Sequence, residues 1–425
     1  MSGRQPWRSI VPHLLLLVGS AVVAELTLQA VALGSPKAAR LLSPEITGAI
    51  PDPVLGARGN PLYPEHDATG YRNRDRPDHA AIVVLGDSHA YGVSVRRDEA
   101  WPHLLESSLG ARVYSMAMPG YCPVENLLQF DEALSFRPQR IIVSVYFGND
   151  FFDAFTFSMR NASVSAAVPP QLARESKVLE AKRALRKDVD VLSSAGESAP
   201  DGDLFVAGVR EWLANHSRLY GLARATWRVA VPAAAPATIG AVDFETLVRT
   251  IPPSRLRYWT IADRPKWRSI LTPSYRGLVV DDRDPRIRLG VEVVKSALKS
   301  MADRSREADI EFLVALLPTK EAVFWPHTDQ THQTLADLVA NETRLKIELT
   351  RDLTSYGVDV VDVTEPLREA GSQPYFESQD GHPNALGHRL IAAVIRGHLA
   401  GEPRTSPNPG ETFRGPHTIE SRPSS

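Results

Sequence analysis

The sequence predicts a doubly wound α/β fold, a three-layer α/β/α sandwich built on five parallel strands. Three observations predict it. Residues 81–85 form an unbroken apolar run that leads into a Gly-Asp-Ser turn at 86–88, as expected of a strand buried on both faces. Strand-like and helix-like segments then alternate, which is typical of βαβ units. After a long interruption, Asp284 and Pro285 resume the alternation with a strong helix-start signal.

The elements follow from the apolar pattern in chain order. Strands are expected where short apolar runs lie between turn residues, and helices where apolar residues recur every three or four positions. The expected strands are residues 81–85, 111–116, 140–147, 310–317 and 358–363. The expected helices of the same domain are residues 99–109, 124–134, 335–356 and 384–399, and one that starts at Asp284.

The alternation is interrupted between residues 151 and 284. No clear strand is expected there, and the composition becomes charged, amphipathic and Pro/Ala-rich by turns. Interruptions of this length are functional or disordered in most proteins, so we interpret this one as an inserted, mostly helical lid or substrate-shaping segment. The expected parts are a membrane anchor or signal segment, a connector, a main domain in two pieces, the insertion and a disordered tail: 1–34, 35–80, 81–150 with 285–400, 151–284 and 401–425.

Residues 10–33 are mostly apolar and follow a short flank that contains Arg4 and Arg8. About 20 apolar residues span a bilayer. We therefore expect one membrane-spanning helix, with the rest of the chain outside the cytoplasm, in the periplasm or at the cell surface. A cleaved secretory signal is the alternative, and it gives the same location. Glu25 interrupts the apolar run, so we expect it to contact another helix or to lie near an interface.

Composition excludes several classes of protein. The chain has 425 residues, a net charge of −2 and a pI near 6.7, without a basic block, so no nucleic-acid partner is expected. The single cysteine, Cys122, excludes an internal disulfide and a multi-cysteine zinc site. The histidines lack the spacing of metal ligands, and no cofactor motif is present. We therefore expect neither a metal nor a cofactor.

Four polar blocks follow four of the expected strands. Ser88 follows the first strand, Gly120 the second, Asn149 the third and His382 the fifth. The carboxyl ends of parallel strands form the ligand site in folds of this class, so these residues are expected to converge. In this order the blocks resemble the signature of the SGNH, or GDSL-type, hydrolase superfamily.

The resemblance covers residues 82–150 and 286–399, and it implies the strand order 2-1-3-4-5. It also implies a serine esterase that works through an acyl-enzyme without a cofactor. Ser88 would be the nucleophile and His382 the general base. Asp380 would accept the other N–H of the imidazole and fix its tautomer.

The same resemblance implies an oxyanion hole with three donors. These are the backbone N–H groups of Ser88 and Gly120 and the side-chain amide of Asn149. Glycine suits position 120 because the backbone there must approach the substrate without a Cβ in the way. We interpret Asp87, in contrast, as a residue that ties down the nucleophile turn by hydrogen bonds.

One spacing departs from many members of the superfamily. This chain has Asp380 two residues before His382, where many members have three. The shorter spacing resembles the branch linked to O-acetylation of exported polysaccharides, which also tends to be membrane-anchored. We therefore expect a glycan acyl ester as substrate. A lipid ester or thioester, an O-acyltransfer reaction, and a non-catalytic envelope binding or assembly protein are the alternatives.

Three further residues have two interpretations each. His89, next to the nucleophile, is expected to be a structural histidine rather than a substrate contact. Cys122 is expected to be a small buried hydrophobe rather than a reactive thiol, because nothing basic flanks it. Lys320 follows the fourth strand at the active-site edge, where a substrate contact and an ordinary exposed lysine both remain open.

Overall fold

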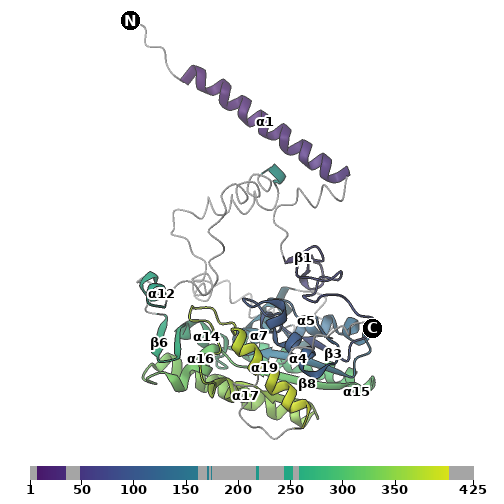
Figure 1. Cartoon of the computed structure of the whole chain (residues 1–425), viewed down its shortest axis with the longest axis vertical. Coiled ribbons are helices and arrows are strands. Elements are labelled where there is room, and N and C mark those ends of the chain that lie inside the picture. Colours follow the sequence, from purple (N-terminus) through teal and green to yellow (C-terminus); the bar gives the residue numbers. More distant parts are fainter. Residues whose placement is uncertain are drawn as a thin grey trace, which may run out of the picture. The chain divides into compact units, whose positions relative to one another are not determined.

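The computed structural model (Figure 1) describes a chain of two compact units. One unit consists of residues 1–47 and 194–241, and the other of residues 48–193 and 242–425. All of the expected site residues belong to the second unit. The described residues are 7–34, 48–160, 170, 171, 174, 217–219, 244–251 and 258–401.

The second unit is built on a five-stranded parallel sheet. β3 (Ile82–Leu85) lies between β4 (Val113–Ser115) and β5 (Arg140–Tyr146), and the sheet continues through β8 (Glu311–Leu317) to β9 (Asp359–Asp362). Every neighbouring pair is parallel. In chain order this is 2-1-3-4-5, so the expected sheet is confirmed and its first strand is an interior one.

Helices cover both faces of the sheet, and this is why its strands are apolar without alternation: every residue of β3 is buried. Right-handed crossovers divide the main helices between the two faces, and the contacts among the helices agree with this division. One face carries α5 (Pro123–Leu128), α7 (Asp150–Arg160), α15 (Pro285–Glu307) and α17 (Gln333–Ser355), and the other carries α4 (Trp101–Leu109) and α19 (Ala385–Leu399).

Short helices complete the second unit. The helix expected at 124–134 is in fact two, α5 and α6 (Phe130–Ser135), which meet at Gln129 because that residue leaves helical geometry (φ −95°, ψ 9°). The remaining short helices are α3 (Ser88–Tyr91), η1 (Arg97–Glu99), α12 (Phe244–Thr250), α14 (Pro273–Val279), α16 (Lys320–Phe324), η4 (Trp325–His327) and α18 (Thr364–Arg368).

Residues 48–80, expected as part of a connector, pack with the sheet. β1 (Ala49–Asp52) pairs with β2 (Gly56–Gly59) in an antiparallel hairpin. Asp67 is buried and accepts a hydrogen bond of 2.7 Å from the hydroxyl of Tyr114 on β4. The packed domain therefore begins well before its first sheet strand.

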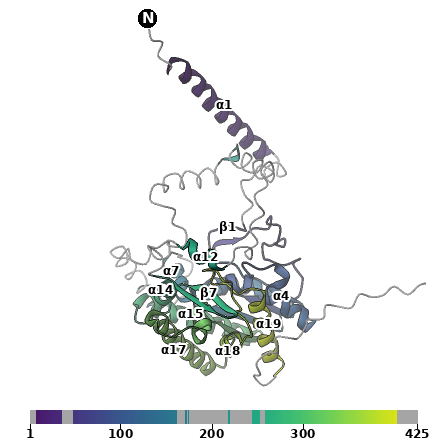
Figure 2. The same cartoon turned by 60° about the vertical axis from the view of Figure 1, so that its left-hand side comes forward.

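The expectation of no strand between residues 151 and 284 is wrong. β6 (Thr260–Arg264) pairs with β7 (Trp267–Leu271) in a second antiparallel hairpin, visible at the β7 label of Figure 2. The turn holds Lys266 at φ 68°. That conformation usually requires glycine or asparagine, so the turn carries no sequence signal. The described residues between 160 and 244 are too few to show the rest of the insertion.

The smaller unit contains α1 (Trp7–Gly34). Glu25 of this helix accepts hydrogen bonds from Gln29, from the Ser217 hydroxyl and from the backbone N–H groups of Arg218 and Leu219. Among the described residues, we find no helix with both the length and the apolarity that crossing a membrane requires. The expected spanning helix is therefore not supported, and the polar pair Glu25 and Gln29 interrupts its apolar sequence.

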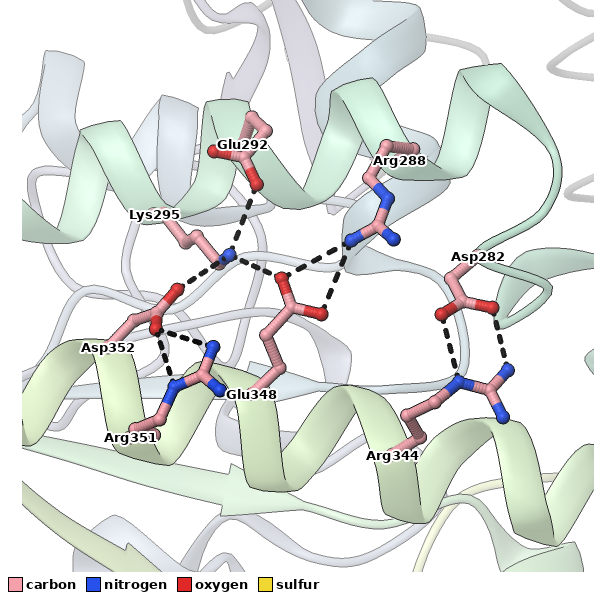
Figure 3. A network of polar contacts seen from close by, with 8 residues as sticks. All are labelled: Asp282, Arg288, Glu292, Lys295, Arg344, Glu348, Arg351 and Asp352. Atoms are coloured by element: carbon pink, nitrogen blue, oxygen red, sulfur yellow. Dashed lines mark hydrogen bonds and ion pairs between the residues drawn. The ribbon is translucent and has the colours of Figure 1, made fainter.

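A charge network joins α15 to α17 (Figure 3). The ammonium of Lys295 lies 2.6 Å from Glu348, 2.8 Å from Asp352 and 3.1 Å from Glu292. Burial acts to lower the pKa of Lys295, but hydrogen bonds to these three carboxylates outweigh it and raise the pKa well above its usual value. Arg288 also reaches Glu348. The network fastens two neighbouring helices on one face of the sheet.

Candidate active site

Ser88 opens helix α3 directly beyond the end of β3. Asp87 caps this helix, since its Oδ1 accepts a 2.9 Å hydrogen bond from the backbone N–H of His89. A Cβ at Gly86 would lie 2.0 Å from the hydroxyl of Ser144 on β5, so only glycine lets the chain turn here. The turn fixes Ser88 at the carboxyl edge of the sheet, and Asp87 ties it down as expected.

One carboxylate oxygen of Asp380 contacts both the backbone and the ring of His382. Oδ1 of Asp380 accepts the backbone N–H of His382 at 3.0 Å and contacts Nδ1 of the same residue at 2.6 Å. The carboxylate thus holds the Nδ1–H tautomer and leaves Nε2 with its lone pair, as a general base requires. Oδ2 accepts a 2.8 Å hydrogen bond from the hydroxyl of Ser94. The shorter spacing is therefore compatible with an oriented histidine.

The charge of Asp380 is stabilised by these contacts. Burial acts to raise the pKa of its carboxyl, but the hydrogen bond and charge of His382 and the hydroxyl of Ser94 outweigh it. The pKa of Asp380 consequently lies well below its usual value, so the carboxylate stays ionised over the whole neutral range. An ionised carboxylate at this position stabilises the imidazolium that forms when His382 accepts a proton.

Gly120 and Asn149 follow β4 and β5. Gly120 has φ 83° and is exposed, and a Cβ there would meet no atom within 4 Å, so its backbone faces open space. The amide nitrogen of Asn149 donates to Asp153 at 2.6 Å. An amide nitrogen carries two hydrogens, so the second remains for an oxyanion. The side-chain oxygen of Asn149, Oδ1, is buried without a partner among the described residues.

A hydrogen bond and a ring contact link the blocks to one another. The backbone N–H of Met118, in the Gly120 loop, donates to the carbonyl of Gly86 at 3.2 Å. The rings of His89 and His382 lie 4.9 Å apart between centroids. The structure therefore brings the Ser88 turn against both the Gly120 loop and the His382 loop.

The Ser88 hydroxyl is hydrogen-bonded to Asp87 rather than to His382. The only hydrogen bond that the structure gives the Ser88 hydroxyl, among the described residues, goes to Oδ2 of Asp87 at 3.3 Å. No contact joins it to His382. Catalytic hydrogen bonds are often long or misaligned without substrate, and rotation about the Cα–Cβ bond of a serine changes which acceptor its hydroxyl faces.

His89 is buried beneath this site, as expected. Its Nδ1 lies 3.2 Å from Oδ2 of Asp87, and its ring stacks on Tyr146 at 3.7 Å between centroids. Burial lowers the pKa of His89 more than the charge of Asp87 raises it, which keeps the ring neutral. Its Nε2 and the hydroxyl of Tyr146 are buried without partners among the described residues.

Cys122 is also buried, and its Sγ donates to Glu125. Burial raises the pKa of the Cys122 thiol well above its usual value. The structure thus agrees with an inert thiol.

Lys320 is buried, so the alternative of an ordinary exposed lysine is wrong. Its side chain is 1% exposed, and its ammonium donates to the backbone carbonyls of Ser378 (2.6 Å) and Asp380 (2.9 Å). Burial lowers its pKa to about 8. Lys320 thus holds the loop that carries Asp380 and His382.

Residues at the end of the insertion form hydrogen bonds to the chain just before Asp380 and His382. The hydroxyl of Ser269 on β7 donates to the carbonyl of Phe376 at 2.8 Å, and the backbone N–H of Ile270 donates to that of Glu377 at 2.9 Å. Arg276 on α14 donates to the carbonyl of Gly148 at 2.8 Å. Together with Ser94, these residues were missed in the sequence, because each acts on a partner tens to hundreds of positions away.

Two further kinds of ligand site are relevant, a metal site and a cavity. The described part of the chain contains no group of three or more His, Cys, Asp or Glu residues placed to hold a metal ion. A cavity of about 460 Å³ is lined by Arg140, Glu311 and Asp359, which begin β5, β8 and β9. This cavity therefore lies at the amino end of the sheet, opposite Ser88.

No family model and no curated protein matches the sequence. Solved structures do match. One is described as a lipolytic protein of the G-D-S-L family from Desulfitobacterium hafniense, with 12% identity, a TM-score of 0.33, and 74% of this chain and 97% of that chain covered. An extracellular lipase from Streptomyces rimosus matches with 12% identity and a TM-score of 0.35, over 74% of this chain and 97% of that one.

An acetyl xylan esterase matches with 9% identity and a TM-score of 0.34, over 75% of this chain and 99% of that one. At these identities and TM-scores the likeness carries no conclusion about activity. The sheet order and the arrangement of the blocks are properties of this structure itself. The structure confirms the 2-1-3-4-5 parallel sheet that the resemblance to the SGNH, or GDSL-type, hydrolases implies, and the Ser88, Gly120 and Asn149 blocks follow its strands β3, β4 and β5.

Proposed function

We propose that this chain is a serine esterase that acts on carboxylic esters through an acyl-enzyme. The observation that carries the proposal is the 2.6 Å contact between Asp380 and Nδ1 of His382, beside the turn that presents Ser88. An oriented imidazole next to a serine at a strand end is the arrangement that activates a hydroxyl for attack.

The proposed reaction starts when the Ser88 hydroxyl turns from Asp87 to Nε2 of His382. Its oxygen attacks the ester carbonyl while its proton passes to Nε2. The negative charge on the tetrahedral intermediate is met by the N–H groups of Ser88 and Gly120 and by the free amide hydrogen of Asn149. The imidazolium then protonates the leaving alcohol, and an acyl-serine remains.

The acyl group leaves Ser88 by a second attack. A water molecule gives hydrolysis, whereas a sugar hydroxyl gives O-acyl transfer, and His382 accepts the proton of either one. The balance between the two outcomes depends on how far a bound acceptor excludes water. Product analysis with and without an added oligosaccharide acceptor separates them.

We infer that the ester is an acyl group on an exported or surface glycan. The proposal is supported by the Asp-x-His spacing of Asp380 and His382 and by the polar groups around them. A lipid ester or thioester is the alternative, and it would require an apolar groove for the acyl chain. A series of aryl esters of increasing chain length, run beside acetylated oligosaccharides, separates these substrates. A preference for long acyl chains would exclude the glycan ester.

The decisive test of the reaction uses Ser88→Ala. This variant should abolish hydrolysis of small aryl acetates while its thermal unfolding stays close to that of the wild type. A fluorophosphonate probe should label the wild type at Ser88 and leave the variant unlabelled. Activity retained in Ser88→Ala would falsify the assignment. Absence of labelling and of activity in the wild type would favour the non-catalytic envelope protein instead.

Location outside the cytoplasm is a separate proposal. It is supported by the apolar residues 10–33 behind a short flank, a pattern shared by signal segments. Alkaline phosphatase fused after His66 should be active. A silent fusion, with a cytosolic reporter active at the same site, would overturn both the location and the envelope substrate.

A further inference from the structure

Arg276 contacts residues of the candidate active site but does not follow a strand of the parallel sheet. It lies on α14, and one terminal nitrogen donates to the carbonyl of Gly148, the residue before Asn149. Its other terminal nitrogen lies 2.8 Å from the position that a Cβ at Gly381, the residue before His382, would occupy. The guanidinium thus sits between the proposed oxyanion block and the proposed base.

The charge of Arg276 is not neutralised by the protein. No carboxylate forms an ion pair with it among the described residues, whereas the neighbouring Arg268, Arg283 and Arg286 are each paired with an acid. Arg276 contacts the faces of two aromatic rings instead, those of Tyr146 at 5.5 Å and Tyr275 at 5.0 Å. A cation held by rings and one carbonyl keeps most of its charge available.

Two acids, Glu321 and Asp153, act on Arg276 through their charges and have other hydrogen-bond donors as partners. Oε1 of Glu321 accepts hydrogen bonds from the backbone N–H and the hydroxyl of Thr272. Asp153 accepts the amide of Asn149. Both therefore act on Arg276 only at a distance, and neither competes for its hydrogen-bond donors.

Most donors of Arg276 have no protein partner, yet they are not sealed off. The side chain is half-buried, and none of its nitrogens is among the fully buried atoms that lack a partner. Glycine at 381 keeps a side chain away from one terminal nitrogen of Arg276, since a Cβ there would lie 2.8 Å from that nitrogen. The free N–H groups of the guanidinium therefore face accessible space at the site.

We propose that Arg276 binds an anionic group of the substrate, a carboxylate or a phosphate, beside the ester that Ser88 attacks. A guanidinium is planar and presents paired N–H groups that match the oxygens of either anion. The inference rests on the proposed esterase function and narrows its substrate class to acidic acylated glycans or to phosphate-bearing ones. It also gives the end of the insertion a role in substrate selection.

The kinetic test compares a monoacetylated methyl glucuronoside with the matched methyl glucoside, acetylated at the same position. The wild type should prefer the acidic ester in kcat/KM. In Arg276→Met that preference should fall at least about 10-fold, mainly through KM, and Arg276→Lys should restore part of it, since one pair of donors is worth about that factor. Arg283→Met, an exposed arginine seven positions on, is the matched control and should leave the preference unchanged.

An equal loss for both esters, expressed in kcat, would show that Arg276 only positions Gly148, and it would overturn the proposal. So would a wild type that does not distinguish the two esters.

A binding test separates this inference from the esterase itself. Calorimetry on Ser88→Ala should show glucuronate or glucose 6-phosphate binding more tightly than glucose, and the added Arg276→Met change should remove the difference. Preference for glucuronate identifies a carboxylate, and preference for glucose 6-phosphate a phosphate. If the anions bind in this way but no ester is cleaved, the proposed function fails and the anion site stands. If esters are cleaved but neither anion binds better than glucose, the anion site fails alone.

Discussion

Polar groups are paired in the α15–α17 network, whereas several buried polar groups at the carboxyl edge of the sheet are unpaired. In the network, Lys295 has three carboxylate partners and Arg288 shares one of them. At the sheet edge, Nε2 of His89, the Tyr146 hydroxyl and the side-chain oxygen Oδ1 of Asn149 are buried without partners among the described residues. An unpaired buried polar group costs about 1–3 kcal/mol. The first region therefore contributes to stability, and the unpaired groups of the second lie where the proposed reaction would take place.

One residue of the sheet edge also has a strained backbone. Ser94, which supports Asp380, is held at φ 69° in the left-handed region. A non-glycine residue there costs of order 1–3 kcal/mol, and such strain gathers at functional sites. Changes at the sheet edge should therefore lower activity more than stability, and changes in the network should do the reverse.

The largest effect is expected for Asp380→Asn. Loss of the carboxylate removes the acceptor that fixes the His382 tautomer, so kcat for aryl acetates should fall by about 10³ to 10⁴-fold. Circular dichroism should still show a folded domain. Activity within tenfold of the wild type would mean that Asp380 does not orient His382, and it would contradict the proposed role of this carboxylate.

A smaller loss is expected for Lys320→Met. The loop carbonyls of Ser378 and Asp380 lose their donor, and the shift of His382 should lower kcat about 10- to 100-fold. Because burial lowers the pKa of Lys320 to about 8, the folded state disfavours its charge. Lys320 therefore contributes stability only at high pH, and this contribution is lost as the pH falls through 8. At pH 7 the melting temperature of Lys320→Met should consequently lie close to that of the wild type. A large fall in melting temperature with unchanged kcat would reverse this assignment.

The opposite pattern is expected for Lys295→Met. Three carboxylates would face one another without a cation, so the free energy of unfolding should fall by about 1–3 kcal/mol while kcat stays unchanged. Denaturant unfolding at pH 7 measures this. Lys299→Met on the same helix is the control, because its exposed pair with Asp303 should contribute less than about 0.5 kcal/mol.

The pH dependence of that difference sharpens the assignment. Hydrogen bonds to Lys295 lower the pKa values of Glu348 and Asp352 more than burial raises them. Acids with a lowered folded pKa add stability above their unfolded pKa, here 4.5 and 3.8, and lose it as the pH falls through the folded value. The wild type and Lys295→Met should therefore converge in stability as the pH falls below these unfolded values and through the lower folded ones. A constant gap from pH 7 to pH 3 would assign the loss to packing alone.

The smallest effect is expected for Ser94→Ala. One hydrogen bond to Asp380 is lost, worth about 1 kcal/mol, so kcat should fall about 5-fold. Ser107→Ala on α4, whose hydroxyl bonds only within its own helix, should change nothing. Equal activity of the two variants would remove Ser94 from the supports of the base.

The sheet and the polar blocks could be predicted because their signals are local. A buried parallel strand such as β3 is apolar at every position, and Ser88 and Asn149 follow their strands directly. Once the strands are placed, the fold itself gathers their carboxyl ends. The β6–β7 hairpin could not be predicted in the same way, because Lys266 occupies a turn position where glycine is the usual signal.

The fold class, the parallel strands and the candidate residues Ser88, Asp380 and His382 could be predicted from the amino-acid sequence, because short-range patterns encode each of them. The groups that surround these residues became evident only in the folded chain. Arg276 and Lys320 are ordinary basic residues in the sequence, and their partners Gly148 and Asp380 lie 128 and 60 positions away. Contacts over such distances depend on how helices and loops pack onto the finished sheet, and no local pattern of side chains records that.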